Sequence, residues 1–327
     1  MKPTLLITGA TGFVGAHLIR HFTKQPYRVI ALGRSPLAPK ALLKTGAKYF
    51  PADLCKDPLP KQADIILHAA GLASDTASPK ALFQANVQGT KRLITKTTHS
   101  FFVYISSSSV YPLSTAVHRE EEPIDPNLLS DYGRSKLQAE KIVASYENLV
   151  ILRPRAIYGT HDRVLLPRIL SLRKGNNILL PCTADNLTSL THVHNLILAI
   201  ETCIRSPSTC AQETFNITDA SPYQLREVVL QIIREATDRR LSVLTFPSPL
   251  VYGISSLIRK LKLNSKINKT SLDMLCKNHV LSIEKARSML GYTPVHTFYN
   301  TYSDIMKWLK TQDLNTYLKD PSNAPWS

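Results

Sequence analysis

Tyr132 and Lys136 are the side chains whose types and spacing say most about chemistry. They lie four residues apart in the stretch SDYGRSKLQAE, and residues with this spacing share one face of a helix. A free phenol has a pKa near ~10, whereas a neighbouring ammonium favours the phenolate and lowers that pKa. The pair is therefore a candidate proton donor and acceptor, although two ordinary surface residues of a helix can have the same spacing.

A glycine-rich segment near the start of the sequence is a candidate phosphate site. In KPTLLITGATGFVGAHLIRHF, an apolar run from Thr4 to Thr8 is followed by Gly9, Gly12 and Gly15. This order predicts a strand, a tight turn and a helix, whose first N–H groups and positive dipole end would bind a pyrophosphate. The spacing GxxGxxG is a variant of the GxGxxG fingerprint of dinucleotide sites.

The end of the next apolar run, YRVIALGRS, indicates which nicotinamide cofactor is favoured. An acidic residue at this place would bind the ribose hydroxyls of NAD(H), and an arginine would bind the 2′-phosphate of NADP(H). The segment ALGRSP contains Arg34 and no carboxylate, and Lys40 lies nearby. NADP(H) is therefore favoured over NAD(H), which stays open if Arg34 stacks on adenine or faces solvent.

These residues need a rigid scaffold, and the apolar pattern predicts one. Strands are expected at 4–8, 28–32, 47–50, 64–68, 101–106 and 149–152. Helices are expected between them, for example from Pro79 to Thr98 and from Asp131 to Tyr146. This alternation predicts an α/β fold with a doubly wound parallel sheet, of the Rossmann type, with the cofactor across the carboxyl ends of the strands.

Beyond about residue 160 the pattern breaks into shorter pieces. Helices are expected near 165–174, 192–205 and 221–237, with FNIT as a strand. We therefore expect a dinucleotide-binding domain over 1–160, to which some later segments return, and a smaller C-terminal α/β lobe over 161–327 that binds the substrate.

Composition fits a basic globular enzyme. The chain has 327 residues, 43% of them hydrophobic and 20% charged, and a net charge of +16. No nucleic-acid-binding motif accompanies this charge, so we expect it to attract an anionic cofactor and substrate and expect no specific nucleic-acid partner. The stretch IRKLKLNSKINK, residues 258–269, is read as a solvated helix, with contact to an anionic membrane surface as the weaker alternative.

The cysteine and histidine patterns predict no metal and a cytoplasmic location. The five cysteines are odd in number and form no CxxC motif, so we expect reduced thiols and no structural zinc. His192 and His194, in SLTHVHNLILAI, are expected to lead into a helix rather than to bind a metal. No signal peptide is visible, and no apolar run approaches the ~20 residues that span a bilayer.

Seven motifs in order give the chain a specific resemblance. They are GATGFVG, Asp53-Leu54, HAAG at 68–71, Asn86 in QANVQGT, YISSSSVY at 104–111, YGRSK and LRPRAIYG at 152–159. With these motifs the chain resembles the extended short-chain dehydrogenase/reductase family, of the NAD-dependent epimerase/dehydratase type. FNITD and the closing SIEKARSMLGYTP are similar to this family's substrate domain, so the resemblance covers nearly the whole chain.

The resemblance implies roles for single residues. It makes Tyr132 the proton carrier, Lys136 its electrostatic partner and a ligand of the nicotinamide ribose, and Ser107 the hydroxyl that holds the substrate oxygen. Ser108 is the alternative within the serine run, and Ser108 and Ser109 would face the substrate. The residues implied to line the cofactor are Gly9, Gly12, Phe13, Val14, Gly15, Arg34, Asp53, Leu54, Ala69, Ala70, Gly71, Asn86, Tyr132, Lys136 and Pro154. Asn86 is equally well explained by bonds to backbone.

The predicted function is therefore an NAD(P)-dependent oxidoreductase that moves hydride between the cofactor and a carbonyl or alcohol substrate. The YGRSK motif, a basic insertion at 239–272 and the SIEKARSMLGYTP ending look more like the 3β-hydroxysteroid dehydrogenase and dihydroflavonol reductase branch than like sugar epimerases. A nucleotide-sugar epimerase or reductase with tightly bound NAD is one alternative, and a cofactor-binding sensor or assembly factor without turnover is another. The resemblance also implies a homodimer.

Overall fold

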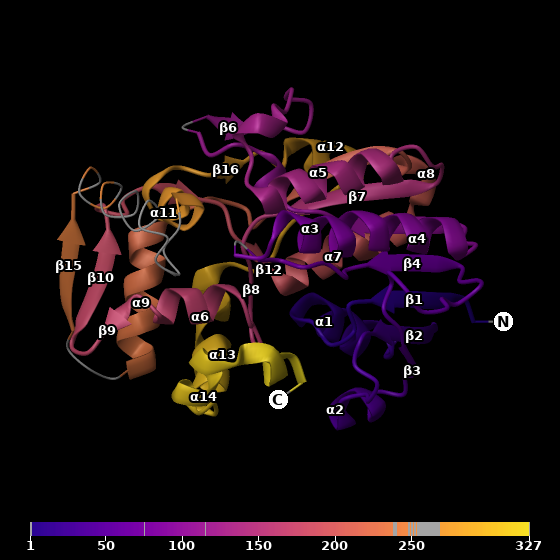
Figure 1. Cartoon of the computed structure of the whole chain (residues 1–327), viewed down its shortest axis with the longest axis horizontal. Helices are drawn as coiled ribbons and strands as arrows, with labels where there is room; N and C mark the ends of the chain where they lie inside the picture. Colours follow the sequence, from indigo (N-terminus) through magenta and orange to yellow (C-terminus); the bar gives the residue numbers. More distant parts are fainter. Residues whose placement is uncertain are drawn as a thin grey trace.

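The central sheet of the protein is parallel and seven-stranded. The structure is a computed structural model that describes residues 2–74, 76–114, 116–237, 241–247, 249, 251, 253 and 269–326. Within these residues the strands follow the order β13-β7-β5-β4-β1-β2-β3 (Figure 1). Their bounds are β1 Thr4–Thr8, β2 Arg28–Gly33, β3 Lys48–Pro51, β4 Ile65–His68, β5 Phe101–Ile105, β7 Leu149–Pro154 and β13 Glu213–Ile217. The six predicted strands are all present, and the doubly wound Rossmann sheet is confirmed.

Helices cover both faces of this sheet, and every residue of its strands β1, β5 and β7 is buried. One face packs against α1 Phe13–Phe22, α2 Lys40–Leu43, α7 Val193–Arg205, α8 Pro207–Cys210 and α12 Glu284–Leu290. The other face packs against α4 Gly89–Lys96 and α5 Asp131–Val143. α3 Pro79–Leu82 and the π-helical η1 Phe83–Gln88 lead into α4. The strand order reverses between β1 and β4, where doubly wound sheets bind their ligands.

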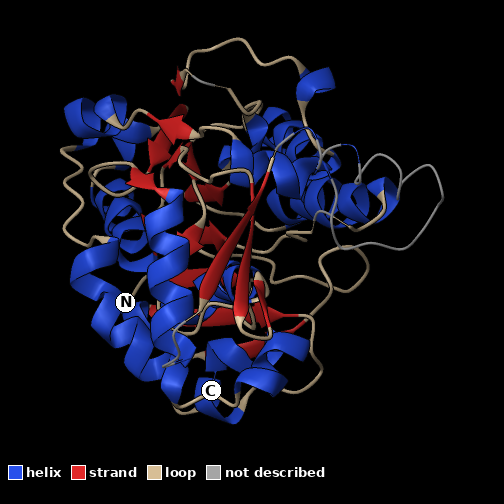
Figure 2. Ribbon diagram, turned by 90° about the vertical axis from the view of Figure 1, so that its left-hand side faces the viewer, coloured by secondary structure: helices blue, strands red, loops and turns tan. Residues whose placement is uncertain are grey.

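A second core forms the lobe at the left of Figure 1. Its sheet has the order β15-β10-β9, with β9 Arg173–Lys174, β10 Asn177–Pro181 and β15 Ser242–Phe246. Around it lie α6 Leu165–Leu170, α9 Leu225–Thr237, α11 Lys269–Cys276, α13 Phe298–Lys310 and α14 Leu314–Lys319. Figure 2 views the molecule from this side, with the lobe strands in front of the central sheet.

The other elements of the described residues are short strand pairs and 3-10 turns. The pairs are β8 Ile157–Tyr158 with β12 Thr191–His192, β11 Leu187–Thr188 with β14 Tyr223–Gln224, and β6 Val117–His118 with β16 Val280–Leu281. The turns are η2 Ser108–Val110, η3 Pro126–Leu128 and η4 Pro321–Trp326. β13, which contains FNI, pairs with β7 in the central sheet, so a segment well beyond residue 160 returns to this sheet. The central sheet and the helices on its two faces are called the dinucleotide side below.

The helix predicted over 165–174 is wrong in its second half. α6 ends at Leu170, and Arg173–Lys174 pairs with β10 as an antiparallel hairpin. Gly175 allows this, because it has φ +60° and reverses the chain. The helix predicted over 192–205 is confirmed by α7.

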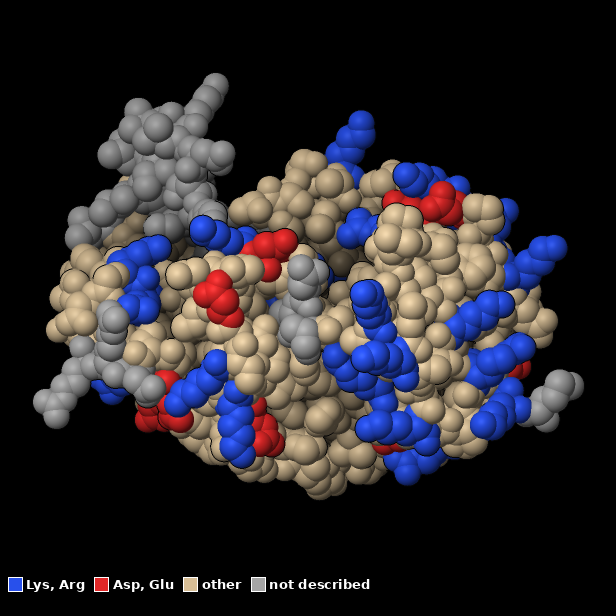
Figure 3. All heavy atoms as spheres, turned by 90° about the horizontal axis from the view of Figure 1, so that it is seen from below, with Lys and Arg blue, Asp and Glu red and all other residues tan. Residues whose placement is uncertain are grey.

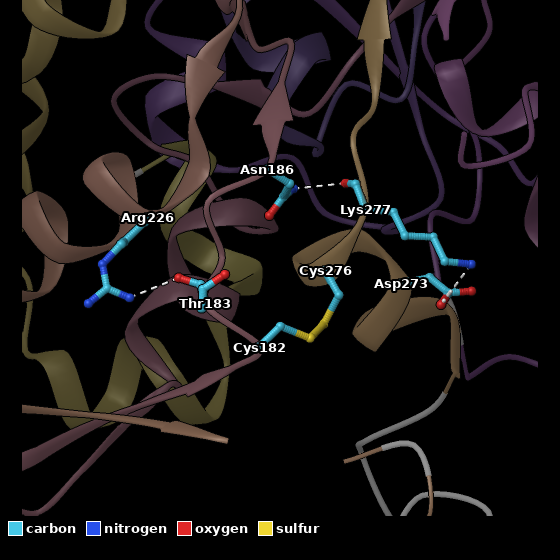
Figure 4. The surroundings of a disulfide bond; sticks show 7 residues. All are labelled: Cys182, Thr183, Asn186, Arg226, Asp273, Cys276 and Lys277. Carbon is cyan, nitrogen blue, oxygen red and sulfur yellow. Dashed lines mark hydrogen bonds and ion pairs between the residues drawn. A yellow bond between two sulfur atoms is a disulfide. The ribbon is translucent and has the colours of Figure 1, made fainter. Parts of the chain in front are cut away.

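The prediction of reduced thiols is wrong for Cys182 and Cys276, which form a disulfide (Figure 4). Cys182 follows β10 and Cys276 ends α11, and the fold brings their Cα atoms to 5.8 Å across 94 residues of sequence. Such a separation produces no local motif, so the pattern around each cysteine could not show it. Cys55, Cys203 and Cys210 are free. The expectation of a cytoplasmic location therefore loses part of its basis, because cytosolic thiols are kept reduced.

Positively charged side chains lie on both parts of the face drawn in Figure 3. Figure 3 shows Lys and Arg side chains scattered over the lower face, on the lobe and on the dinucleotide side. Of the basic stretch 258–269, all but the last residue lies outside the described part of the chain. Among the described helices, none has the length and apolar character that would let it cross a membrane.

Candidate active site

The glycine-rich turn joins β1 to α1 through backbone conformations that other residues rarely adopt. Gly9 has φ +73°, and its carbonyl accepts a 2.8 Å hydrogen bond from the N–H of Gly12. A Cβ atom at Gly15 would lie 2.1 Å from the Gly9 oxygen, so the first turn of α1 packs directly on this turn. α1 has no acidic residue in its first turn. Its N-terminus therefore presents N–H groups and a positive dipole end, as a diphosphate requires.

The turn after β4 completes this cofactor site. A Cβ atom at Gly9 would approach the backbone of Ala69 and Ala70 to 3.0 Å, and the Thr8 hydroxyl accepts a 3.1 Å bond from the Ala70 N–H. The structure thus brings together the predicted residues Gly9, Gly12, Phe13, Val14, Gly15, Ala69, Ala70 and Gly71. Gly12 and Gly71 leave these turns without side chains, which fits the close approach of a dinucleotide.

The segment Pro321–Trp326 lies against the outer side of this turn and of α1. The Trp326 indole N–H donates a 3.0 Å hydrogen bond to the carbonyl of Ala10. The Arg20 guanidinium lies over the same ring, 4.6 Å from its centroid. The glycine-rich turn is therefore supported by residues from both ends of the described chain, a contact that no local pattern predicts.

The adenosine end of the predicted site lies at the ends of β2 and β3. Arg34 is exposed immediately after β2. Leu54 is buried, and the Asp53 carboxylate accepts a 2.8 Å hydrogen bond from the N–H of Cys55. The Asp53 side chain is thus used to shape its own loop.

Arg163, which follows the motif YGTHD, faces Arg34. Burial lowers the pKa of Arg163, and the positive charge of Arg34 lowers it further, while Asp320 and Asp162 act in the opposite direction. Two guanidinium groups near enough to repel each other favour an anion between them. No local sequence pattern links these two arginines, because 129 positions of sequence separate their numbers.

Lys136 is buried beneath the surface of α5. Its ammonium donates a 2.8 Å hydrogen bond to the carbonyl of Ile105 and lies 4.3 Å from the ring centroid of Tyr104. Burial lowers the pKa of Lys136 to about 7, and the negative charge of Glu140 opposes this shift. Tyr132 lies one turn earlier on α5 and is partly exposed. Burial raises the pKa of Tyr104, with smaller contributions from Glu140 and Tyr132, so the Tyr132 phenol lies near that of Tyr104.

The serine run forms a turn that α5 packs against. The Ser107 hydroxyl accepts a 3.1 Å hydrogen bond from the Ser109 N–H and lies 3.1 Å from the Ser109 hydroxyl. Ser107 and Ser109 are half-buried and Ser108 is buried. A Cβ atom at Gly133 would lie 2.1 Å from the Ser109 carbonyl oxygen. The helix that bears Tyr132 and Lys136 therefore meets the serine turn with nothing between them.

A buried ionic network fixes the back of α5, and sequence reasoning missed it. The Arg153 guanidinium binds both carboxylate oxygens of Glu140, at 3.0 and 2.7 Å. Arg153 also donates a 2.7 Å bond to the Tyr111 hydroxyl, which donates to Asn216 at 3.0 Å. Ser106 donates to Glu140 as well. The motif LRPRAIYG contained the signal, because an arginine inside an apolar strand needs a buried acidic partner.

Two predicted cofactor residues lie at the margin of the site. Asn86 is buried, and its amide bonds the backbone N–H and C=O of Leu72 at 2.6 and 3.2 Å and the Ser135 hydroxyl at 2.9 Å. These contacts are the bonds to backbone considered from the sequence, and they tie the loop after β4 to α5. Pro154 ends β7 and is buried beside Ile217 of β13.

Together these groups can carry proton-coupled chemistry on an oxygen atom. A phenol, a buried amine with a pKa of about 7 and a serine turn stand at the carboxyl end of β5. The anion-binding end of α1 stands at the carboxyl end of β1, two strands away in the sheet. A dinucleotide that spans these strand ends would place its far ring near the phenol.

The chain is similar to known proteins in sequence and in fold. A family model described as the NAD dependent epimerase/dehydratase family matches residues 5–218. A 2-alkyl-3-oxoalkanoate reductase of Stenotrophomonas maltophilia is 26% identical over 89% of this chain and 94% of its own. A sterol-4-alpha-carboxylate 3-dehydrogenase (decarboxylating) of Dictyostelium discoideum is 27% identical over 88% and 95%. The solved UDP-glucuronic acid 4-epimerase of Bacillus cereus, in complex with NAD, superposes with a TM-score of 0.74, 18% identity and coverage of 94% and 99%.

Proposed function

The chain belongs to the NAD dependent epimerase/dehydratase family and is an enzyme of the oxidoreductase or epimerase kind. We propose that it is a reductase or dehydrogenase that acts on a lipid-like ketone or alcohol. The observation that carries this proposal is the position of the buried Lys136 amine, one helical turn from Tyr132. Gly133 lies between these two residues and lets α5 pack directly on the serine turn. The names of the two relatives quoted, both of which act on alkyl or sterol compounds, support the substrate class.

In this proposal the nicotinamide cofactor, held by the glycine turn and by the residues after β4, supplies or accepts a hydride at the substrate carbon. Tyr132 donates the proton to the substrate oxygen during reduction and removes it during oxidation. Ser107 donates a hydrogen bond to that oxygen and stabilises the charge that develops on it. Lys136 has its pKa of about 7 close to working pH, so it can stabilise the phenolate and pass its proton on.

We propose NADP(H) as the preferred cofactor. Arg34 is exposed at the end of β2, where a 2′-phosphate would lie, and Arg163 contributes a second nearby positive charge. The segment 31–36 offers no carboxylate for a free ribose hydroxyl pair. Arg34→Ala should then weaken NADPH binding by tenfold or more, which is about 1.4 kcal/mol, and leave NADH binding within twofold.

The first experiment is to identify any nucleotide released from the freshly purified, denatured protein, and then to titrate the stripped protein with NADPH and NADH. An empty protein that prefers NADPH supports a reductase that exchanges its cofactor at each turnover. Stoichiometric NAD that co-purifies would contradict the proposal and favour an epimerase that recycles its own hydride.

Tyr132→Phe tests the proton step separately. We expect kcat for ketone reduction to fall about 10²- to 10⁴-fold, with the affinity for NADPH unchanged. Wild-type turnover in Tyr132→Phe would remove the phenol from the mechanism, whatever the cofactor.

We also propose a homodimer, on resemblance, through the face that α4 and α5 form where they pack together on one side of the sheet. Light scattering on the purified chain tests this, with a mass of 36.5 kDa as the monomer value.

A further inference from the structure

Three histidines from two distant segments meet at the junction of the two cores. His192 ends β12, His194 lies in the first turn of α7, and His296 lies in the segment before α13. One ring nitrogen of each lies within 4.8 Å of the others. The ring centroids are 5.2 Å apart for His192 and His194, 4.8 Å for His192 and His296, and 5.4 Å for His194 and His296.

We propose that His192, His194 and His296 form a binding site for a divalent transition ion of the zinc class. This site goes beyond the proposed oxidoreductase function and contains none of the residues assigned to it. Three imidazole nitrogens with a solvent molecule in the fourth position are a common tetrahedral zinc set. Among the described residues no carboxylate or thiolate joins this group, and all-imidazole ligation favours Zn²⁺, Co²⁺, Ni²⁺ or Cu²⁺ over Mg²⁺ or Ca²⁺.

The backbone that carries two of these rings is held by one buried amide and one buried carboxylate. The Asn195 side chain accepts a 3.0 Å bond from the His296 N–H and donates a 2.7 Å bond to the His296 carbonyl. The same amide donates to Asp219 at 2.7 Å, and Asp219 accepts a 2.8 Å bond from the His192 N–H. His192 and His296 are therefore fixed relative to each other, although 104 positions of sequence separate their numbers.

The hydrogen bond of His192 and the burial of all three rings fit metal ligation. The Nδ1 atom of His192 accepts a bond from the His194 N–H at 3.3 Å, which leaves Nε2 as its ligand atom. Burial lowers the pKa of all three rings, and neighbouring histidines lower the pKa of His192 and of His194 further. Neutral imidazole is the form that binds a metal.

The site also has an entry path and room to adjust. Ligand nitrogens around a tetrahedral zinc lie about 3.3 Å apart, given Zn–N bonds of about 2.0–2.1 Å. The three nitrogens must therefore move together by about 1 Å. His192 is buried, but His194 is exposed and His296 is half-buried, and these two side chains can make the movement.

An ion at this place would link the two cores. α7, which starts at the site, packs on the central sheet, whereas α13, which follows His296, packs in the core of the lobe. His192 also contacts the ring of Tyr158, at 5.1 Å between centroids, and Tyr158 hydrogen-bonds Asp219 at 2.7 Å. A bound ion would therefore stabilise the lobe against the dinucleotide side.

The test uses the full chain without a histidine tag, stripped with a chelator and measured without any dinucleotide. CoCl₂ titration followed by visible absorption reports geometry, ZnCl₂ competition reports affinity, and elemental analysis reports stoichiometry. We expect one ion per chain, visible bands of tetrahedral cobalt and no displacement by millimolar Mg²⁺. Affinity should fall at least about 100-fold in His194→Gln and in His296→Gln, and stay within twofold in His99→Gln, a histidine of the loop before β5.

Zinc should also raise the melting temperature of the wild type and of His99→Gln, but not of the two site variants. His194→Gln changes an exposed side chain, so its fold can be checked by circular dichroism before titration. Binding of less than half an equivalent, octahedral cobalt spectra, or equal affinity in the wild type and both site variants would overturn the proposal. The absence of dinucleotide from every measurement separates this outcome from that of the proposed oxidoreductase function.

Discussion

The dinucleotide side and the lobe are built from contacts of different reach. On the dinucleotide side, the candidate site depends on close approaches of backbone: Gly12 and Gly15 both lie against the Gly9 carbonyl, and Gly133 lies against the carbonyl of Ser109, 24 positions earlier in the chain. In the lobe, β10 pairs with β15 from another part of the sequence, and a disulfide joins positions 94 residues apart. In the first region, one added side-chain atom at such a glycine should therefore displace the site. In the second, stability should depend on links between distant segments.

The largest effect is expected in the lobe, from removal of the disulfide by Cys182→Ser together with Cys276→Ser. Closing a loop of 94 residues restricts the unfolded chain, and the loss of that restriction should lower the free energy of unfolding by roughly 4–5 kcal/mol. Chemical denaturation without reductant measures it. The control is Cys55→Ser, which removes a free thiol that is only partly buried.

A thiol count sharpens this prediction. The denatured wild type should react with three equivalents of a thiol reagent, from Cys55, Cys203 and Cys210, and with five after reduction. Five reactive thiols before reduction, or a stability change below about 1 kcal/mol, would show that the lobe does not depend on this link.

The next largest effect is expected on the dinucleotide side, where a substitution should raise the free energy of unfolding rather than lower it. Lys136→Met removes a buried amine whose pKa is lowered by burial from 10.5 to about 7. The cost of burying it at pH 7 is on the order of 4 kcal/mol, and the lost hydrogen bond to Ile105 offsets about 1 kcal/mol. We expect a gain in stability of roughly 2–3 kcal/mol, together with loss of turnover.

The pH dependence of that gain follows from proton counting. Between pH 7 and 10.5 the unfolded chain holds a proton on Lys136 that the folded chain has released. Wild-type stability therefore rises with pH across this window, and the advantage of Lys136→Met should be greatest at and below pH 7 and absent near pH 10.5. Lys141→Met, an exposed lysine of the same helix, is the control. A gain that is independent of pH would refute this explanation.

The smallest effects are expected when one glycine in each region is replaced by alanine. Gly133→Ala places a methyl group 2.1 Å from the Ser109 carbonyl, so α5 must move, at a cost of about 1–3 kcal/mol. Gly175→Ala meets nothing within 4 Å, and its φ of +60° costs about 1 kcal/mol. Turnover should fall strongly in Gly133→Ala and stay near wild type in Gly175→Ala, measured at a temperature where both variants are folded. Equal activities would mean that the serine turn tolerates displacement of Tyr132.

The reach of these contacts also explains what the sequence could predict. Strands such as Thr4–Thr8 and Phe101–Ile105 are continuous apolar runs bounded by turn residues, so their positions follow from local pattern. The same holds for the YxxxK pair on α5. The Cys182–Cys276 bond and the approach of Arg163 to Arg34 join segments that leave no mark on each other's local sequence. For the Glu140–Arg153 pair, the arginine inside an apolar strand indicated a buried acidic partner but not which one. The family resemblance covered the site residues but not these links.

The hydrogen bond from Trp326 to Ala10 has a consequence for synthesis. The two residues are 316 positions apart, and a ribosome that adds about 5–20 residues per second needs roughly 15–60 s to travel between them. During that time the glycine-rich turn can fold, but the Ala10 carbonyl does not yet have its hydrogen-bond donor from Trp326. The indole is added after the lobe has been translated, so this contact forms only once all the residues between Ala10 and Trp326 have been made.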